Sequence, residues 1–267
     1  LYAVGETEQG SVSAFDGAGE PIATVSSGGA QPCQLLVTDD RLWIANYGDG
    51  TAAAVPLDAD GGFAGPALTF PGTGAGPDPD RQSGPHAHSA TVVGDEVWVA
   101  DLGTDTLRRF EGGAELDPVR LPPGSGPRHL AVLPDGAVAV STELDDGLVV
   151  VADGAVVARV PATATPPPAG ARNYPSHVAL VGELLVVAVR GADVLSSFRI
   201  GPAGPVHLAD SPVGGAWPRH FAATDGYVLV ACERSHELTV LTLDPASGRA
   251  AQVGRMAIDA PACVLPL

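Results

Sequence analysis

The 267-residue sequence is acidic and rich in apolar residues. Its 14 basic residues are all arginine, and they face 31 aspartates and glutamates, which gives a formal net charge of −17 at pH 7. Binding to nucleic acid or to a membrane surface needs a basic face, so the composition argues against both kinds of partner. At 45% hydrophobic residues, the chain has enough apolar side chains to build a folded core.

The three cysteines form neither a disulfide framework nor a metal-binding pair. Cys33 and Cys263 hold comparable positions in two repeats, and we expect both to be small buried apolar residues. No apolar run approaches the ~20 residues of a membrane-spanning helix, and the chain opens on no signal-peptide pattern. Together these features predict a cytoplasmic protein.

A proline followed within two residues by histidine or cysteine recurs six times. These anchors begin at Pro32, Pro85, Pro127, Pro175, Pro218 and Pro261, with spacings of 53, 42, 48, 43 and 43 residues. A period near 43 residues is typical of a four-stranded blade of a β-propeller. Because no segment has helical periodicity, we predict an all-β propeller of four-stranded antiparallel blades, with residues 1–267 as a single domain.

In chain order, the first predicted strand is Leu1–Val4, which has the position of the second strand of a blade. The third repeat shows the pattern most clearly, with apolar stretches at 129–133, 137–140 and 148–151 separated by an Asp-Gly turn and a polar break. We expect loops at 71–84 and 161–174. Pro261–Leu267 is predicted to be the first strand of a closing blade, which gives about six blade-equivalents.

Antiparallel pairing places the start of a blade's first strand and the end of its second strand at the same sheet edge. The innermost strands of a propeller ring its channel, so the sequence predicts a polar rim at one channel mouth. The anchors bring His86, His88, Arg128, His129, His177, Arg219 and His220 to this rim, and the strand ends bring Asn46, Asp101, Glu143, Arg190 and Glu233. Charges in a narrow channel are costly unless paired or used, so the rim is either an ion-pair network or a site for an anionic substrate.

Four motifs in order resemble the lactonase family of seven-bladed β-propellers. They are Gly-Pro-His-Ala-His at 84–88, Gly-Pro-Arg-His at 126–129, Trp-Pro-Arg-His at 217–220 and Pro-Ala-Cys at 261–263. The family includes the cycloisomerase-type 6-phosphogluconolactonases and the carboxy-muconate lactonizing enzymes. The resemblance covers essentially the whole chain. Since the family has seven blades, we expect an N-terminal blade's worth of its pattern to be absent here.

The resemblance implies a catalytic set of His86, Arg128, Glu143 and Arg190. The other rim residues expected to bind substrate are His88, Asp101, His129, His177, Arg219 and His220. The implied activity is hydrolysis of a small anionic sugar-acid lactone in carbohydrate metabolism, without a cofactor or metal. We expect a monomer or weak oligomer. Either Glu143 or His86 would act as the general base, while the two arginines would hold an anionic group or an oxyanion.

Three alternatives stay open. The first is a cycloisomerase of the carboxy-muconate type, which would use the same residues to move a proton at carbon. The second is a metal-dependent propeller lactonase, in which Asn46, Asp101, Glu143 and Glu233 would supply oxygen ligands to Ca²⁺. The third is a propeller that binds a ligand without catalysis, because a fold does not fix a function.

Overall fold

A computed structural model describes residues 1–266. Over these residues the chain forms antiparallel β-sheets and a single three-residue 3-10 helix, which confirms the predicted all-β class. The chain divides into two compact units, Leu1–Pro127 and Arg128–Leu267, and each is described by itself. The organisation of residues 1–267 as a single domain stays a prediction.

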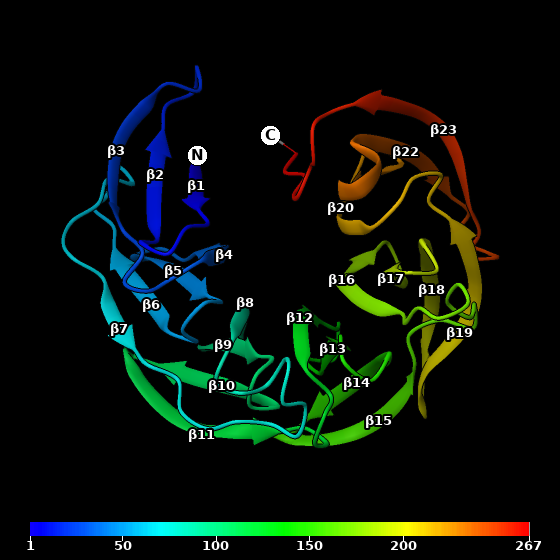
Figure 1. The fold of residues 1–267 in the computed structure, drawn as a ribbon, viewed down its shortest axis with the longest axis horizontal. Helices are drawn as coiled ribbons and strands as arrows, with labels where there is room; N and C mark the ends of the chain where they lie inside the picture. The colour runs from blue at the N-terminus through cyan, green and yellow to red at the C-terminus, as the bar shows by residue number, and fades with distance from the viewer. Residues whose placement is uncertain (267) are drawn as a thin grey trace. The chain divides into compact units, whose positions relative to one another are not determined.

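The first unit contains three sheets whose strands follow one another in chain order (Figure 1). The first sheet holds β1 (Tyr2–Gly5), β2 (Ser11–Phe15) and β3 (Pro21–Ser26); the second holds β4 (Pro32–Val37), β5 (Arg41–Asn46), β6 (Ala52–Pro56) and β7 (Leu68–Phe70); the third holds β8 (Ala87–Val93), β9 (Glu96–Asp101), β10 (Thr106–Glu111) and β11 (Ala114–Arg120). The three-stranded first sheet agrees with the prediction that the chain opens on the second strand of a blade.

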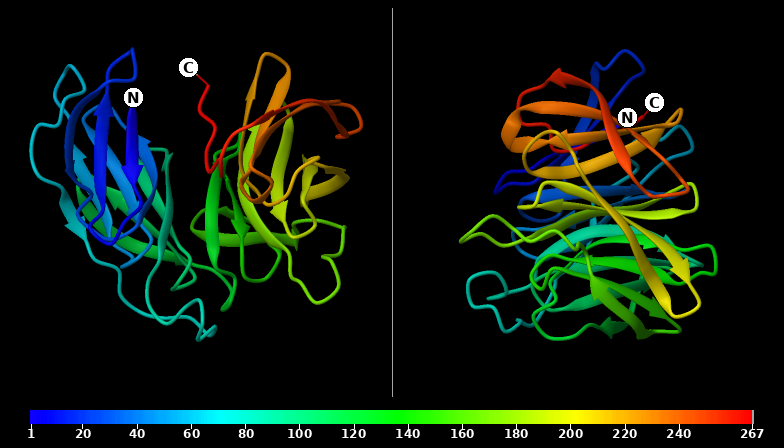
Figure 2. Two further views of the ribbon diagram at one scale, coloured as in Figure 1. Left: turned by 45° about the horizontal axis from the view of Figure 1, so that its top comes forward. Right: turned by 90° about the vertical axis from the view of Figure 1, so that its right-hand side faces the viewer.

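The second unit contains three four-stranded sheets, and the twist of the individual sheets is visible in Figure 2. They are β12 (Pro127–Val132), β13 (Val138–Thr142), β14 (Gly147–Ala152) and β15 (Ala155–Pro161); β16 (Tyr174–Val181), β17 (Leu184–Arg190), β18 (Val194–Gly201) and β19 (Gly204–Pro212); and β20 (Pro218–Thr224), β21 (Tyr227–Cys232), β22 (Glu237–Leu243) and β23 (Ala250–Ala257). The 3-10 helix η1 (Glu233–Ser235) joins β21 to β22.

The first strand of each four-stranded sheet begins within two residues of a predicted anchor proline. In the sheet β16–β19, Tyr174 pairs with Arg190, and in the sheet β20–β23, Pro218 pairs with Cys232. The anchor and the end of the second strand therefore share a sheet edge, as predicted. The strand predicted over Pro261–Leu267 is wrong for its described part, because residues 261–266 adopt no strand; Leu267 lies outside the described residues. There, the Val264 N–H donates to a side chain instead of pairing in a sheet.

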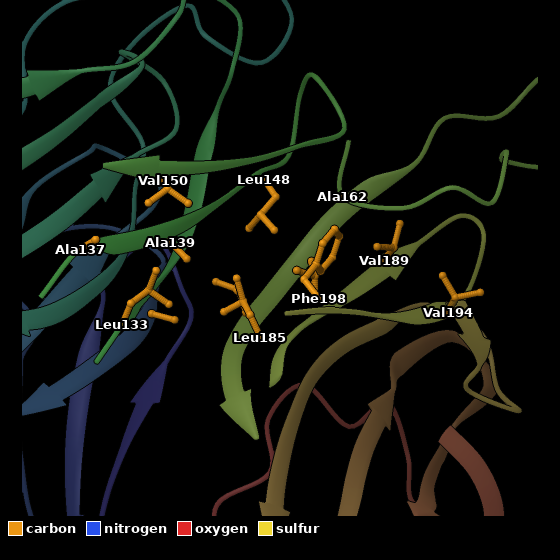
Figure 3. Close-up of a cluster of buried hydrophobic side chains, with 13 residues drawn as sticks. Leu133, Ala137, Ala139, Leu148, Val150, Ala162, Leu185, Val189, Val194 and Phe198 are labelled. Atoms are coloured by element: carbon orange, nitrogen blue, oxygen red, sulfur yellow. The ribbon is translucent and has the colours of Figure 1, made fainter. Parts of the chain in front are cut away.

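The core of the second unit lies between neighbouring sheets. Figure 3 shows one cluster, in which Leu148 of β14, Leu185 of β17 and Phe198 of β18 are fully buried together. Strand β17 reads Leu-Leu-Val-Val-Ala-Val-Arg and is buried along its whole length. A strand covered on both faces has no solvent side, which explains why its sequence is a continuous apolar run rather than an alternating one.

Aspartates in left-handed turns hold the loops that lead into the first strands. Asp105 and Asp193 have φ of 55° and 53°, a conformation that aspartate tolerates better than most residues. Asp105 accepts hydrogen bonds from the Gly124 and Gly126 N–H groups, each at 2.7 Å. In the second unit, Asp193 accepts the Trp217 N–H at 2.8 Å. These bonds fix the backbone immediately before two of the anchor motifs.

The cysteines are all free thiols, and their burial differs from the expectation. Cys33 is half-buried and Cys263 is exposed, so the expectation of a buried apolar role is wrong for Cys263. Its segment, residues 261–266, is not packed into a sheet, which leaves the side chain open. No helix within residues 1–266 is both long and apolar enough to span a membrane.

Candidate functional site

The second unit brings three of the four predicted catalytic residues into one buried ion-pair cluster. Arg128 lies near the start of β12, Glu143 directly follows β13, and Arg190 ends β17 of the neighbouring sheet. Glu143 Oε2 lies 2.9 Å from Arg128 Nε and accepts a hydrogen bond from Arg190 Nη2 at 2.6 Å. The exposed fractions of the three side chains are only 4%, 5% and 9%. The sheet-edge argument therefore correctly predicts that residues far apart in sequence meet here.

This cluster carries a net positive charge, because one carboxylate faces two guanidinium groups. A second bond fixes Arg190, whose Nε donates to the Tyr174 carbonyl oxygen at 3.1 Å. Guanidinium groups are permanently charged and present planar forks of donors that match carboxylate, phosphate or an oxyanion. In a chain with a net charge of −17, the Arg128–Glu143–Arg190 cluster is a local concentration of positive charge.

Three predicted rim histidines, one from each sheet of the second unit, contact one another beside this cluster. His129 and His177 approach to 3.1 Å between their Nδ1 atoms, and the His177 and His220 ring centroids are 4.0 Å apart. Burial, and then repulsion by His129, His220 and Arg128, holds the pKa of His177 well below its usual value. Burial, and then Arg128, lowers the pKa of His220 to about 4. Both rings are therefore neutral near pH 7 and add no positive charge to that of the arginines.

The fourth predicted catalytic residue, His86, belongs to the first unit. Its Nδ1 lies 2.7 Å from the Tyr47 carbonyl oxygen, which only accepts hydrogen bonds. The proton of the neutral ring is therefore on Nδ1, and Nε2 carries the lone pair that a general base needs. The Tyr47 ring stacks on His86 with centroids 4.6 Å apart, and the Tyr47 hydroxyl accepts a bond from Arg81 Nη2 at 3.2 Å. Tyr47 was not among the residues predicted from the sequence, although it directly follows Asn46, which was predicted to lie on the rim.

Asp101 and His88 occupy different environments in the first unit. Asp101 is 1% exposed, and its Oδ1 accepts the His86 and Gly103 N–H groups at 2.8 and 3.1 Å. Burial raises the pKa of this carboxyl group. Asp101 thus holds the turn that carries His86, and these bonds do not favour its predicted contact with substrate. His88 is buried next to Cys33 and contacts the Tyr47 ring edge-on.

An aromatic pair that sequence reasoning did not single out surrounds Arg190. The Arg190 guanidinium carbon lies 5.8 Å from the Tyr174 ring centroid and 5.2 Å from that of Trp217. The two rings contact each other at 5.7 Å. Trp217 has φ of 66°, which is rare for a bulky residue and is a form of backbone strain that clusters at functional sites. The only sequence signal was the position of Trp217 immediately before an anchor motif.

The remaining predicted residues form ordinary pairs or polar bonds. Arg219 Nη1 donates to Glu233 Oε1 at 3.1 Å, and both side chains are about one quarter exposed. Asn46 is fully buried and donates to the carbonyl oxygens of Ser27 and Thr51. Since the Glu143 and Glu233 carboxylates already face arginines, the proposed Ca²⁺ ligands of the second unit have cationic neighbours that would repel the ion.

Comparisons with known proteins identify the family of this chain. Residues 1–266 match the family model described as "Lactonase, 7-bladed beta-propeller". A 6-phosphogluconolactonase of Bacillus subtilis is 28% identical over 88% of this chain and 73% of its own length.

Solved structures show the same likeness. A candidate 6-phosphogluconolactonase from Bacteroides fragilis has 27% identity and a TM-score of 0.87, covering 98% of this chain and 82% of its own. The periplasmic gluconolactonase of Pseudomonas aeruginosa has 26% identity and a TM-score of 0.85, with 98% and 83% covered. By sequence and by fold, this chain belongs to the lactonase family of seven-bladed β-propellers.

Proposed function

We propose that this protein hydrolyses a small anionic sugar-acid lactone, with 6-phosphogluconolactone as the leading substrate. The observation that carries the proposal is the buried Arg128–Glu143–Arg190 cluster, in which one carboxylate holds two arginines in fixed positions. The names of the relatives support the same reaction class. The cytoplasmic location and the oligomeric state stay predictions.

Lactone hydrolysis adds water across a ring ester. The water oxygen attacks the carbonyl carbon, negative charge develops on the carbonyl oxygen, and the ring C–O bond then breaks as the leaving oxygen takes a proton. Arg128 and Arg190 supply fixed positive charge for an anionic group of the substrate or for the developing oxyanion. Glu143 orients both guanidinium groups, because its Oε2 is the atom they share.

A base must accept a proton from the attacking water. The Glu143 oxygen that meets two arginines is already engaged, whereas His86 has its proton fixed on Nδ1 and a lone pair on Nε2. We therefore favour His86 as the proton acceptor. Its membership of the same site as Arg128 stays a prediction from the anchor pattern and the family resemblance.

The test is turnover of a panel of sugar lactones, phosphorylated and unphosphorylated, followed by acid release. We compare the wild type with Arg128→Met, Glu143→Gln and His86→Gln, and use Arg249→Gln as a control because Arg249 is an exposed arginine of the same unit. The expected loss in kcat/KM is about 10²-fold or more for each of the three site variants and none for the control. Full activity in both Arg128→Met and Glu143→Gln would show that the site assignment is wrong.

A further inference from the structure

A third arginine, Arg234, lies over the aromatic ring that also contacts the buried cluster. Arg234 lies on η1 and is exposed, and its guanidinium carbon sits 3.3 Å from the Trp217 ring centroid. Trp217 is the ring that also contacts Arg190. The Trp217 ring therefore contacts both a guanidinium of the buried ion-pair cluster and the guanidinium of an exposed arginine.

Main-chain hydrogen bonds hold Trp217 and the 3-10 helix η1 next to each other. The Glu233 N–H donates to the Trp217 carbonyl oxygen, and the Arg234 N–H donates to that of Ala216, both at 3.2 Å. The Trp217 N–H is in turn held by Asp193 at 2.8 Å. The main chain therefore holds η1, which carries Arg234, next to Trp217, and the left-handed conformation of Trp217 belongs to the same turn.

The guanidinium of Arg234 has unused hydrogen-bonding capacity. Among the residues that the structure describes, it has no ion pair and no side-chain hydrogen bond. The neighbouring carboxylate of Glu233 is paired with Arg219, and that of Asp193 binds a main-chain N–H. An arginine positioned over an aromatic face leaves the N–H groups at the edge of its guanidinium available for bidentate binding of a phosphate.

We propose that Arg234, stacked on Trp217, is a subsite for the phosphate group of a phosphorylated sugar lactone. This inference rests on the proposed function, because it places the substrate's reacting carboxyl end at Arg128 and Arg190. It gives the chain a means of preferring a phosphorylated lactone over the unphosphorylated one. Arg172 is a weaker candidate for the same role, because its Nη2 already donates to the Leu144 carbonyl oxygen.

The experiment compares 6-phosphogluconolactone with gluconolactone as substrates of the wild type, Arg234→Gln and Arg234→Lys. A charge-assisted hydrogen bond corresponds to about 10- to 100-fold in affinity, so Arg234→Gln should lower the ratio of the two kcat/KM values by that factor. Arg234→Lys keeps the charge without the planar fork and should lose part of the preference. The control Arg249→Gln, another exposed arginine, should leave the ratio unchanged.

Calorimetric binding of the two products, 6-phosphogluconate and gluconate, provides a readout that needs no turnover. We expect the wild type to bind the phosphorylated product at least about 10-fold more tightly, and Arg234→Gln to lose that difference. If the wild type turns over neither lactone, the proposed function is wrong. The calorimetry then still shows whether Arg234 binds the phosphate group. The subsite is wrong if the wild type has no preference for the phosphorylated product, or if Arg234→Gln retains it.

Discussion

The Glu143→Gln variant probes whether a single carboxylate keeps two buried arginines together. Arg190 Nη2 and Arg128 Nε lie 2.6 and 2.9 Å from the same Glu143 oxygen, so these nitrogens are at most about 5.5 Å apart. Two positive charges at that distance repel by about 3 kcal/mol at an effective dielectric constant of ~20. Glutamine keeps the side-chain shape but removes the compensating charge.

We therefore expect Glu143→Gln to lower the free energy of unfolding by about 3 to 5 kcal/mol, the usual cost of an uncompensated buried charge. Urea unfolding at neutral pH, followed by far-ultraviolet circular dichroism, measures the change. The matched control is Glu237→Gln, which removes a long 3.9 Å pair with Arg255, a side chain that is 71% exposed. A pair of that kind contributes at most about 1 kcal/mol.

The effect of inorganic phosphate on unfolding provides a second test of the same variant. Because Glu143→Gln leaves two arginines without a counterion, inorganic phosphate should bind the folded variant and raise its urea midpoint more than that of the wild type. The reasoning is refuted if Glu143→Gln unfolds within about 0.5 kcal/mol of the wild type, a change typical of surface substitutions. Equal effects of phosphate on the two proteins would contradict the electrostatic explanation.

Two further predictions concern the half-buried His220 and a close backbone approach. The pKa of His220 is lowered to about 4 from the ordinary 6.5, so the unfolded chain takes up this proton first and stability is lost as pH falls between these values. From pH 7 to pH 5 the wild type should therefore lose about 2 kcal/mol more than His220→Asn in urea unfolding, and equal losses would contradict the lowered pKa of His220. At Gly103, an added Cβ would lie 1.9 Å from the Gly84 carbonyl oxygen. Gly103→Ala should displace the turn that carries His86, destabilise the fold by about 1 to 3 kcal/mol and reduce lactone turnover, whereas Gly84→Ala, which meets no atom within 4 Å, should do neither. Comparable activity and stability in the two alanine variants would show that the close approach is not needed.

The architecture was predictable because turn-forming residues and short apolar runs recur with the period of the repeat. Five of the six anchor prolines, all except Pro261, lie within two residues of a strand start, and β17 is an apolar run of six residues that ends in Arg190. Antiparallel pairing then brings Arg128 and Glu143 to one edge of a sheet. That step needs only the order of strands, which the period of the repeat supplies.

Side-chain partners were less predictable, because they depend on rotamers and on contacts between sheets. Nothing in the sequence shows that Glu143 uses one oxygen for two arginines, or that Trp217 adopts a left-handed conformation and contacts both Arg190 and Arg234. Cys263 illustrates the opposite error. Its Pro-Ala-Cys motif matches the strand-starting anchors, but residues 261–266 form no strand and the thiol is exposed.

The most direct test of the central claim is a crystal structure of the protein with 6-phosphogluconate, the product of the proposed reaction. We predict that the product's carboxylate lies within hydrogen-bond distance of Arg128 or Arg190, beside the Glu143 carboxylate. A product carboxylate bound away from both arginines, in a protein that turns over the lactone, would contradict the claim that the Arg128–Glu143–Arg190 cluster is the active centre.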